Sequence, residues 1–227
     1  MQLVFDIETD GFLEDMTKCH VLVCQDVVTK KLYTFTDIKN GLDFMSNAVA
    51  LIGHNIIGFD LMALEKLYGW KPSPKTRLVD TWIMSQTLQF NRSHKHGLAG
   101  WGGYLGYKKM DNSEWAADGF KTYDPRMIDY CINDVKLNTK VYEVLLAELQ
   151  KAIEINDLIK KGLRVEHDVA EFEAVVRKTG WLFDLSKAQE NLRLMTRHMN
   201  KIESIIEPKL GTTKVFIDKA PKTAKYT

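Results

Sequence analysis

The sequence has few cysteines, no long apolar run and no excess of charge of either sign. Its three cysteines, Cys19, Cys24 and Cys131, are an odd number without CxxC spacing, which argues against a disulfide framework or a zinc site. No apolar run approaches the roughly 18 residues of a membrane-spanning helix, and no hydrophobic signal region precedes the first predicted strand. The formal net charge of +1 gives the chain as a whole no electrostatic footprint for nucleic acid. We therefore expect a cytoplasmic protein without membrane association.

The chain contains enough apolar residues for a sizeable core. Hydrophobic residues make up 45% of its 227 residues and charged residues 27%, as in a globular protein and unlike a disordered one. This length fits one domain, or one domain together with part of another. The near-neutral total still permits an acidic metal pocket surrounded by basic contacts.

Strand patterns come early in the chain, and helical patterns dominate its later part. Strands are predicted at 2–9, 20–24, 31–35, 50–53 and 78–79, the second and third forming an antiparallel hairpin. Helices are predicted at 43–48, at 59–68, from near 80 and from near 124, and at 186–206. One strand–helix–strand unit is present, which favours an α/β or α+β sheet covered by helices.

Two carboxylates interrupt the first predicted strand. Asp6 and Glu8 are two residues apart, so they point to the same face of a strand and lie side by side. Two like charges on a buried face repel and lose hydration, and a divalent cation is the simplest way to make the pair tolerable. The alternative is a strand end that reaches solvent at Asp6.

Two further stretches contain acidic residues at defined places. Asp60 opens a predicted helix after the strand end at His54-Asn55, where ordinary helix capping is the alternative to metal binding. Tyr130 and Asp134 are four residues apart in a predicted helix and so share one face. A hydrogen-bonded core pair would explain that spacing equally well.

Together these stretches resemble the three-motif pattern of proofreading 3′→5′ exonucleases of the ribonuclease-H-like superfamily. The third motif is that of the subtype with tyrosine in place of histidine. The residues that match are Asp6-x-Glu8, then Asn55 with Phe59-Asp60, then Tyr130-x-x-x-Asp134. The segments at 54–60 and 79–81 are especially similar to the exonuclease domain of phage-type family A DNA polymerases.

The resemblance implies an α/β fold with a ribonuclease-H-like mixed sheet flanked by helices, plus a C-terminal helical extension. Residues 1–150 would form the exonuclease domain, and 151–227 a helical connector and the start of the family A polymerase region. In the matching family A segment a helix ends at Gly180, a short strand follows, and Asp184 caps the next helix. The later polymerase motifs are absent, so we expect a fragment or a split gene product.

The resemblance also implies a site with two Mg²⁺ or Mn²⁺ ions, which prefer the oxygen ligands of carboxylates. Asp6 would bridge the two ions, Glu8 and Asp134 would complete one of them, and Asp60 would hold the other. Tyr130 would position the attacking water, because a phenol with a pKa of about 10 is a poor base at pH 7.

Substrate contacts are expected at the 3′ end of single-stranded DNA. Thr9 and its neighbouring backbone N–H groups would meet the terminal nucleotide, and Asn55 would bind sugar or phosphate unless it only stabilises a turn. Phe12 and Leu13 would wedge against the terminal bases, a core position being the alternative.

Two other functions compete with proofreading of DNA for a family A polymerase. One is a free-standing ribonuclease-D-like RNA exonuclease, and the other is a catalytically silent scaffold for a polymerase. A silent scaffold would lack one or more acidic ligands, and here all four are present with the tyrosine. The expected partner is a polymerase domain of the same or a separate chain, and the protein is expected to be a monomer.

Overall fold

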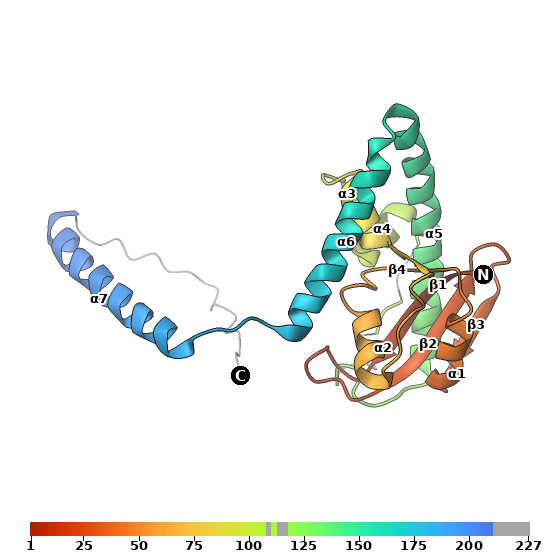
Figure 1. Cartoon of the computed structure of the whole chain (residues 1–227), viewed down its shortest axis with the longest axis horizontal. Coiled ribbons are helices and arrows are strands. Elements are labelled where there is room, and N and C mark those ends of the chain that lie inside the picture. The colour runs from red at the N-terminus through yellow and green to blue at the C-terminus, as the bar shows by residue number, and fades with distance from the viewer. Residues whose placement is uncertain (108–109, 113–117, 211–227) are drawn as a thin grey trace. The chain divides into compact units, whose positions relative to one another are not determined.

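The computed structural model describes residues 1–107, 110–112 and 118–210 (Figure 1). Within this part the chain forms two compact units, one ending at Thr179 and one beginning at Gly180. Each unit is described by itself below. No helix in the described residues is long and apolar enough to cross a membrane.

The N-terminal unit is built on one five-stranded mixed sheet. Its strands are β1 (Gln2–Thr9), β2 (Cys19–Asp26), β3 (Leu32–Phe35), β4 (Ala50–Gly53) and β5 (Arg77–Asp80). Their order is β3-β2-β1-β4-β5; β2 is antiparallel to both β1 and β3, whereas β4 and β5 run parallel to β1. The predicted hairpin and all five predicted strands are confirmed, and β1 is the central strand.

Six helices complete this unit in the described residues. They are α1 (Ile38–Met45), α2 (Asp60–Tyr68), α3 (Thr81–Leu88), α4 (Leu98–Leu105), α5 (Arg126–Ile155) and α6 (Leu158–Thr179). The helix predicted at 43–48 begins earlier than expected, at Ile38, because Ile38 and Leu42 bury one face of that segment. The other predicted helix starts, near residues 60, 80 and 124, are confirmed.

The alternation of β1 divides the core into two layers. Leu3, Phe5 and Ile7 belong to the apolar cluster that α1 and α2 cover. Val4, on the opposite face, belongs to the cluster formed with α3, α4 and α5. Asp6 and Glu8 have the same parity as Val4, so they lie on the α5 face of the sheet.

The C-terminal unit consists in its described part of a short connection and one long helix, α7 (Leu185–Leu210). Asp184 caps this helix as predicted, with its carboxylate accepting the Lys187 amide at 2.8 Å. Gly180 has φ of 67°, in agreement with a helix end at glycine. The prediction of a short strand after Gly180 is wrong, because residues 181–184 form no strand and pair with none in the described chain.

Candidate active site

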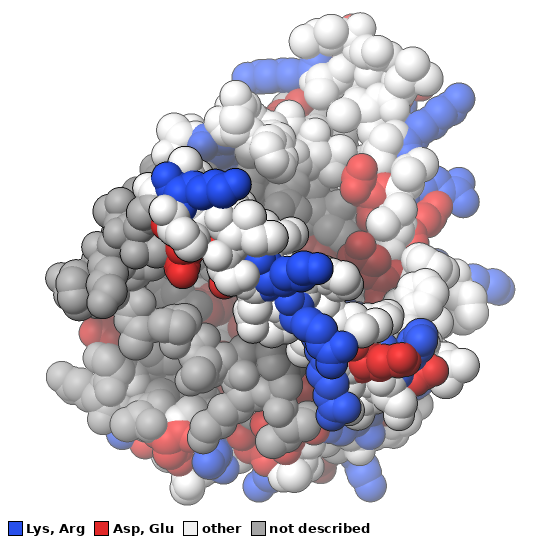
Figure 2. All heavy atoms as spheres, turned by 90° about the vertical axis from the view of Figure 1, so that its left-hand side faces the viewer, with Lys and Arg blue, Asp and Glu red and all other residues white. Residues whose placement is uncertain are grey.

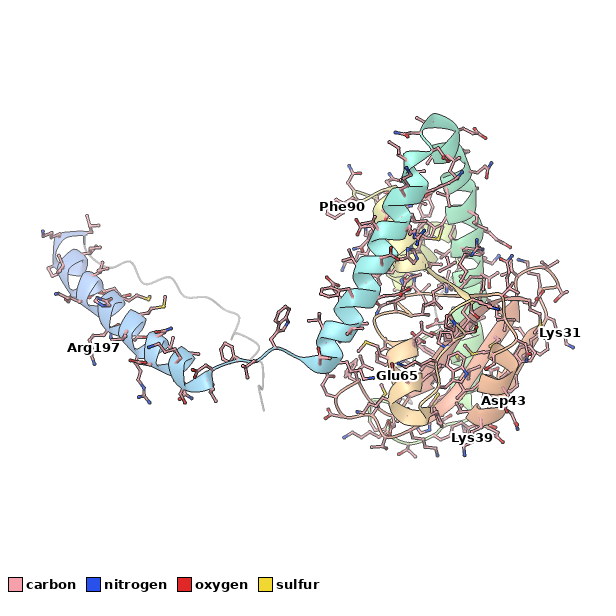
Figure 3. All side chains as sticks on the ribbon, in the orientation of Figure 1. Lys31, Lys39, Asp43, Glu65, Phe90 and Arg197 are labelled. Carbon is pink, nitrogen blue, oxygen red and sulfur yellow. The ribbon has the colours of Figure 1, made fainter. Side chains whose placement is uncertain are left out.

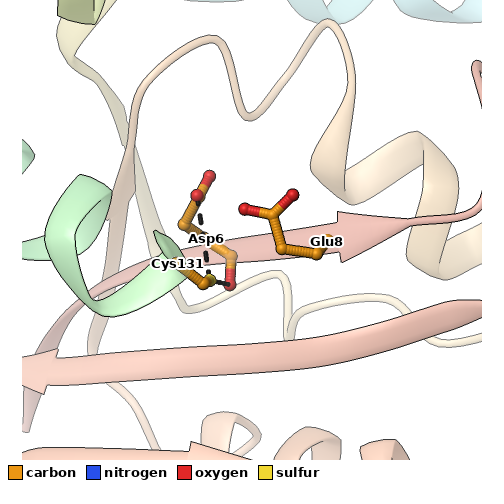
Figure 4. A group of neighbouring side chains, drawn as sticks. All are labelled: Asp6, Glu8 and Cys131. Carbon is orange, nitrogen blue, oxygen red and sulfur yellow. Dashed lines mark hydrogen bonds between the residues drawn. The ribbon is translucent and has the colours of Figure 1, made fainter. Parts of the chain in front are cut away.

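Asp6 and Glu8 lie side by side at the centre of the sheet, as the two-residue spacing predicts. Figure 4 shows their carboxylates beside the thiol of Cys131, and the ligand atoms of these three residues all lie within 4.8 Å of one another. Asp6 is partly exposed and Glu8 is 9% exposed. Solvent can therefore reach Asp6, while Glu8 and the thiol are buried.

Helix α5 brings the third motif to the same place. Its buried face includes Tyr130, Cys131 and Asp134, which follow the helical spacing of one side. The pKa of the Cys131 thiol is raised well above its usual range, first by burial and then by the charges of Asp6, Glu8 and Asp134. Those three carboxylates are therefore close enough to act electrostatically on one thiol, and Asp134 itself is only 4% exposed.

Asp60 approaches the site from the first turn of α2. It is 4% exposed, and burial raises its pKa to about 8. The charge of Asp80 also raises the pKa of Asp60. Hydrogen bonds from its own backbone amide and from the amide of Ile7 lower that pKa, but they do not offset the effect of burial. The bond to Ile7 brings this carboxyl to the backbone of β1. Ordinary capping alone does not explain that contact.

This burial leads to a prediction for the metal-free protein. The Asp60 carboxyl ionises above about pH 4 in the unfolded chain but only near pH 8 in the folded one, so it lowers stability progressively as the pH rises between these values. The Asn side chain of Asp60→Asn cannot ionise. We therefore expect this variant to raise the free energy of unfolding at pH 8 by a few kcal/mol, the size that follows from the difference between the folded and unfolded pKa values. Urea unfolding in EDTA at pH 5 and pH 8 measures the effect.

Magnesium provides the control for that measurement. If Asp60 holds an ion, Mg²⁺ should stabilise the wild type more than the Asn variant, because the ion binds only the folded state. Equal stabilisation of the two proteins by Mg²⁺ would contradict a ligand role for Asp60.

Asp80 is the N-cap residue of α3, and it also holds the loop that carries the second motif. Its carboxylate accepts the amides of Trp82 at 2.9 Å, Asn55 at 2.9 Å and Ile57 at 3.2 Å. The Asp80 amide in turn donates to Nε2 of His167 on α6. Sequence reasoning missed this second role, because the loop lies some 25 residues from Asp80 and no local pattern reports the contact.

A buried polar network fixes α5 relative to the sheet. The hydroxyl of Thr81 lies 2.7 Å from Oδ1 of Asn138, 2.9 Å from Nδ1 of His54 and 3.1 Å from the Gly53 carbonyl. Asn138 is one turn beyond Asp134 on the same helix face. The network therefore helps to set the position of Asp134, and no local sequence pattern indicated it, because Thr81 and Asn138 are 57 residues apart.

The residues expected to contact substrate lie around the end of β1. The Thr9 hydroxyl donates to the Gly11 carbonyl at 2.9 Å, so it stabilises the turn that follows. Phe12 is 77% exposed, which excludes the core position considered for it, whereas Leu13 packs against the apolar core. Asn55 is exposed with φ of 63°, a left-handed conformation that asparagine tolerates in turns.

A groove of about 1100 Å³ begins beside Leu13, but none of Asp6, Glu8, Asp60 and Asp134 lines it. Its other lining residues are Ile57 and residues of α2, the 71–78 segment and α6. Glu65 of α2, labelled in Figure 3, forms ion pairs across it with Lys178 of α6 and with Lys71. The carboxylate cluster is the better candidate for an active site, because catalysis needs converging polar groups and the groove is mainly apolar.

The donor set of the cluster suits a hard divalent cation. Carboxylate oxygens are the ligands that Mg²⁺ and Mn²⁺ prefer. Asp6 and Glu8 supply them from β1, Asp134 acts on the same thiol from α5, and Asp60 reaches the β1 backbone from α2. The raised pKa of Asp60 is the response of a buried carboxyl to lost hydration and neighbouring negative charge, which a bound cation would offset. Asp6, Glu8, Asp60 and Asp134 therefore fit as metal ligands.

Comparison with solved structures assigns the chain to a class by fold. It aligns with NrnC of Brucella melitensis bound to pGG (18% identity, 81% of this chain and 88% of that one, TM-score 0.59). It also aligns with RNase D of Escherichia coli (18% identity, 75% and 45%, TM-score 0.53). The chain thus shares the fold of these two proteins, and the expected α/β fold with a mixed sheet flanked by helices is confirmed.

Comparison by sequence points to particular relatives. The chain is 26% identical to the DNA-directed DNA polymerases of Escherichia phage T7 and Enterobacteria phage T3, over 98% of its own length. The resemblance to a phage-type DNA polymerase is confirmed. The chain spans 40% of the length of these relatives. No protein-family model matches it.

Proposed function

We propose that the chain is a divalent-metal-dependent 3′→5′ exonuclease that hydrolyses the terminal phosphodiester of single-stranded DNA and proofreads for a family A DNA polymerase. The side-by-side placement of Asp6 and Glu8, with Asp134 acting on the same Cys131 thiol and Asp60 bonded to the β1 backbone at Ile7, is the observation that supports it most. Similarity to the phage polymerases favours DNA as the substrate.

In this proposal Asp6, Glu8, Asp60 and Asp134 hold two Mg²⁺ or Mn²⁺ ions. When bound, such ions lower the pKa of a water and stabilise the leaving 3′ oxygen. The chain's own contribution is to preorganise the four carboxylates: β1 fixes two of them, and the network at Thr81 and the loop held by Asp80 fix the elements that carry the others.

Tyr130 is proposed to orient the attacking water through its hydroxyl. Its side chain is 9% exposed, and its ring centroid lies 5.8 Å from that of Phe120. Packing of this kind restricts the ring and hence the direction of the hydroxyl, which is what a positioning role requires.

Tyr130→Phe should therefore lower kcat by about tenfold to 100-fold, the loss expected for a misplaced reactant. The Mg²⁺ concentration for half-maximal activity should stay within about twofold, because no carboxylate is removed. Steady-state kinetics on a 5′-labelled oligonucleotide at several Mg²⁺ concentrations separates the two quantities. A change confined to the Mg²⁺ dependence would argue against positioning of water.

The terminal nucleotide is proposed to meet Thr9, Phe12 and Asn55. Because the Thr9 hydroxyl bonds the Gly11 carbonyl, Thr9 would contribute chiefly through its main chain. Phe12 is exposed enough for its ring to stack on a base, an interaction that tolerates any sequence. On the face drawn in Figure 2, Lys and Arg side chains of the described residues lie among Asp and Glu side chains.

An RNA exonuclease is the second candidate, supported by one observation. The RNase D of Escherichia coli that shares this fold is an exoribonuclease involved in structured RNA processing. A silent scaffold is less well supported, since all four carboxylates and Tyr130 are present. The main proposal also includes a monomeric state and a cytoplasmic location. Its partner would be a polymerase region of the same or a separate chain.

Digestion of 5′-labelled and 3′-labelled oligonucleotides tests the proposal. With Mg²⁺ the 5′-labelled DNA should shorten stepwise, the 3′ label should be released first, and EDTA should stop both reactions. The matched RNA should be cut more slowly. Faster cutting of RNA would favour the second candidate, and no cutting of either by folded protein would favour the scaffold.

A further inference from the structure

Cys131 is the one component of the cluster that an oxygen-based metal site does not need. Its Sγ lies 3.4 Å from the Asp6 carbonyl oxygen and 3.8 Å from Oδ2 of the same residue (Figure 4). Both the Asp6 and the Glu8 carboxylates lie within 4.8 Å of this sulfur. An ion held by the two carboxylates would therefore meet a soft ligand on its inner side.

The spacing suits a thiophilic ion. Zinc binds sulfur at about 2.3 Å and carboxylate oxygen at about 2.0–2.2 Å, so tetrahedral geometry separates the two ligand atoms by about 3.6 Å. The observed separation of 3.8 Å between Sγ and Oδ2 is close to that value. Magnesium gains nothing from a thiol, whereas zinc and cadmium do.

We propose that Cys131 gives this site a second metal-binding mode, in which Asp6, Glu8 and Cys131 hold one thiophilic divalent ion such as Zn²⁺ or Cd²⁺ and the exonuclease is inhibited. The inhibitory part rests on the proposed function. The ion–sulfur bond replaces the S–H bond, and the proton passes to the buffer. The ion occupies the carboxylates in a geometry drawn toward the sulfur, which competes with Mg²⁺.

The other two cysteines differ from Cys131 in position. Cys19 and Cys24 both belong to the apolar cluster on the α1 and α2 face, opposite to that of Asp6 and Glu8. The Cys19 thiol donates to the Val21 carbonyl at 3.4 Å, and Cys24 is fully buried. They therefore serve as internal controls in the same molecule.

Cadmium binding tests the mode without any enzymatic readout. Titrating Cd²⁺ into the metal-free chain should produce ultraviolet thiolate-to-cadmium absorption that saturates at one ion per chain. Cys131→Ala and Cys131→Ser should abolish this absorption, and Cys24→Ala should leave it unchanged, with circular dichroism checking that each variant is folded. Undiminished absorption in folded Cys131→Ser protein would overturn the proposal.

Inhibition provides the second arm. At fixed Mg²⁺, the Zn²⁺ concentration that halves digestion of a DNA oligonucleotide should rise at least about tenfold in Cys131→Ser, the size of effect expected when one ligand is lost. An unchanged concentration would overturn the inhibitory role. If wild type digests nothing in Mg²⁺, the proposed function fails, while the cadmium titration still decides whether the second mode exists.

Discussion

Asp6→Asn is expected to lower the exonuclease rate by about 10³-fold or more while the protein stays folded. Asp6 lies at the centre of the cluster, next to Glu8 and in contact with Cys131 of α5. Metal ions contribute several kcal/mol of transition-state stabilisation, and each 1.36 kcal/mol corresponds to a factor of ten in rate. The rate is measured by single-turnover digestion of a 5′-labelled oligonucleotide with saturating Mg²⁺.

A surface carboxylate provides the matched control for this variant. Asp43, labelled in Figure 3, is an exposed residue of α1. Asp43→Asn removes the same charge away from the cluster, so it should leave the rate within about twofold. Comparable losses in the two variants would mean that net charge, and not the metal site, governs the rate.

Asp80→Ala is expected to produce the largest loss of stability, about 3 kcal/mol. The variant removes a buried acceptor shared by the amides of the 54–59 loop and by the first turn of α3. A helix cap contributes about 1 kcal/mol, and hydrogen bonds to a charged group contribute about 1.5–3 kcal/mol each without full additivity. Urea unfolding measures the change, and the midpoint should fall in proportion.

Asp37 offers a control of the same residue type at the same kind of position. It is the N-cap residue of α1, but its side chain makes no capping hydrogen bond there. Asp37→Ala should cost no more than about 0.5 kcal/mol, as for an ordinary surface substitution. An equal loss in both variants would show that Asp80 acts only as a generic helix-start residue.

The central part of the site follows from local periodicity. The two-residue alternation of β1 predicts that Asp6 and Glu8 share a face, and four-residue spacing predicts the same for Tyr130 and Asp134. Both are local properties, and both are observed. The convergence of the two pairs depends on long-range packing of α5 on the sheet, which only the resemblance to known exonucleases indicated.

Contacts between distant segments could not be predicted from the sequence. The bonds from the 54–59 loop to Asp80 and from Thr81 to Asn138 join residues far apart in the chain. Cys131 fits the pattern of an apolar helix face, and no local pattern indicates that its sulfur lies against Asp6. The strand expected after Gly180 failed because a strand needs a pairing partner, which a local pattern cannot supply.

A crystal structure of the protein soaked with Mn²⁺ tests the central claim most directly, because anomalous scattering locates the ions independently of any activity. The account predicts ions within coordinating distance of Asp6, Glu8, Asp60 and Asp134, at the α5 face of β1. Ordered Mn²⁺ bound only elsewhere, or the four carboxylates left without an ion at saturating Mn²⁺, would contradict it.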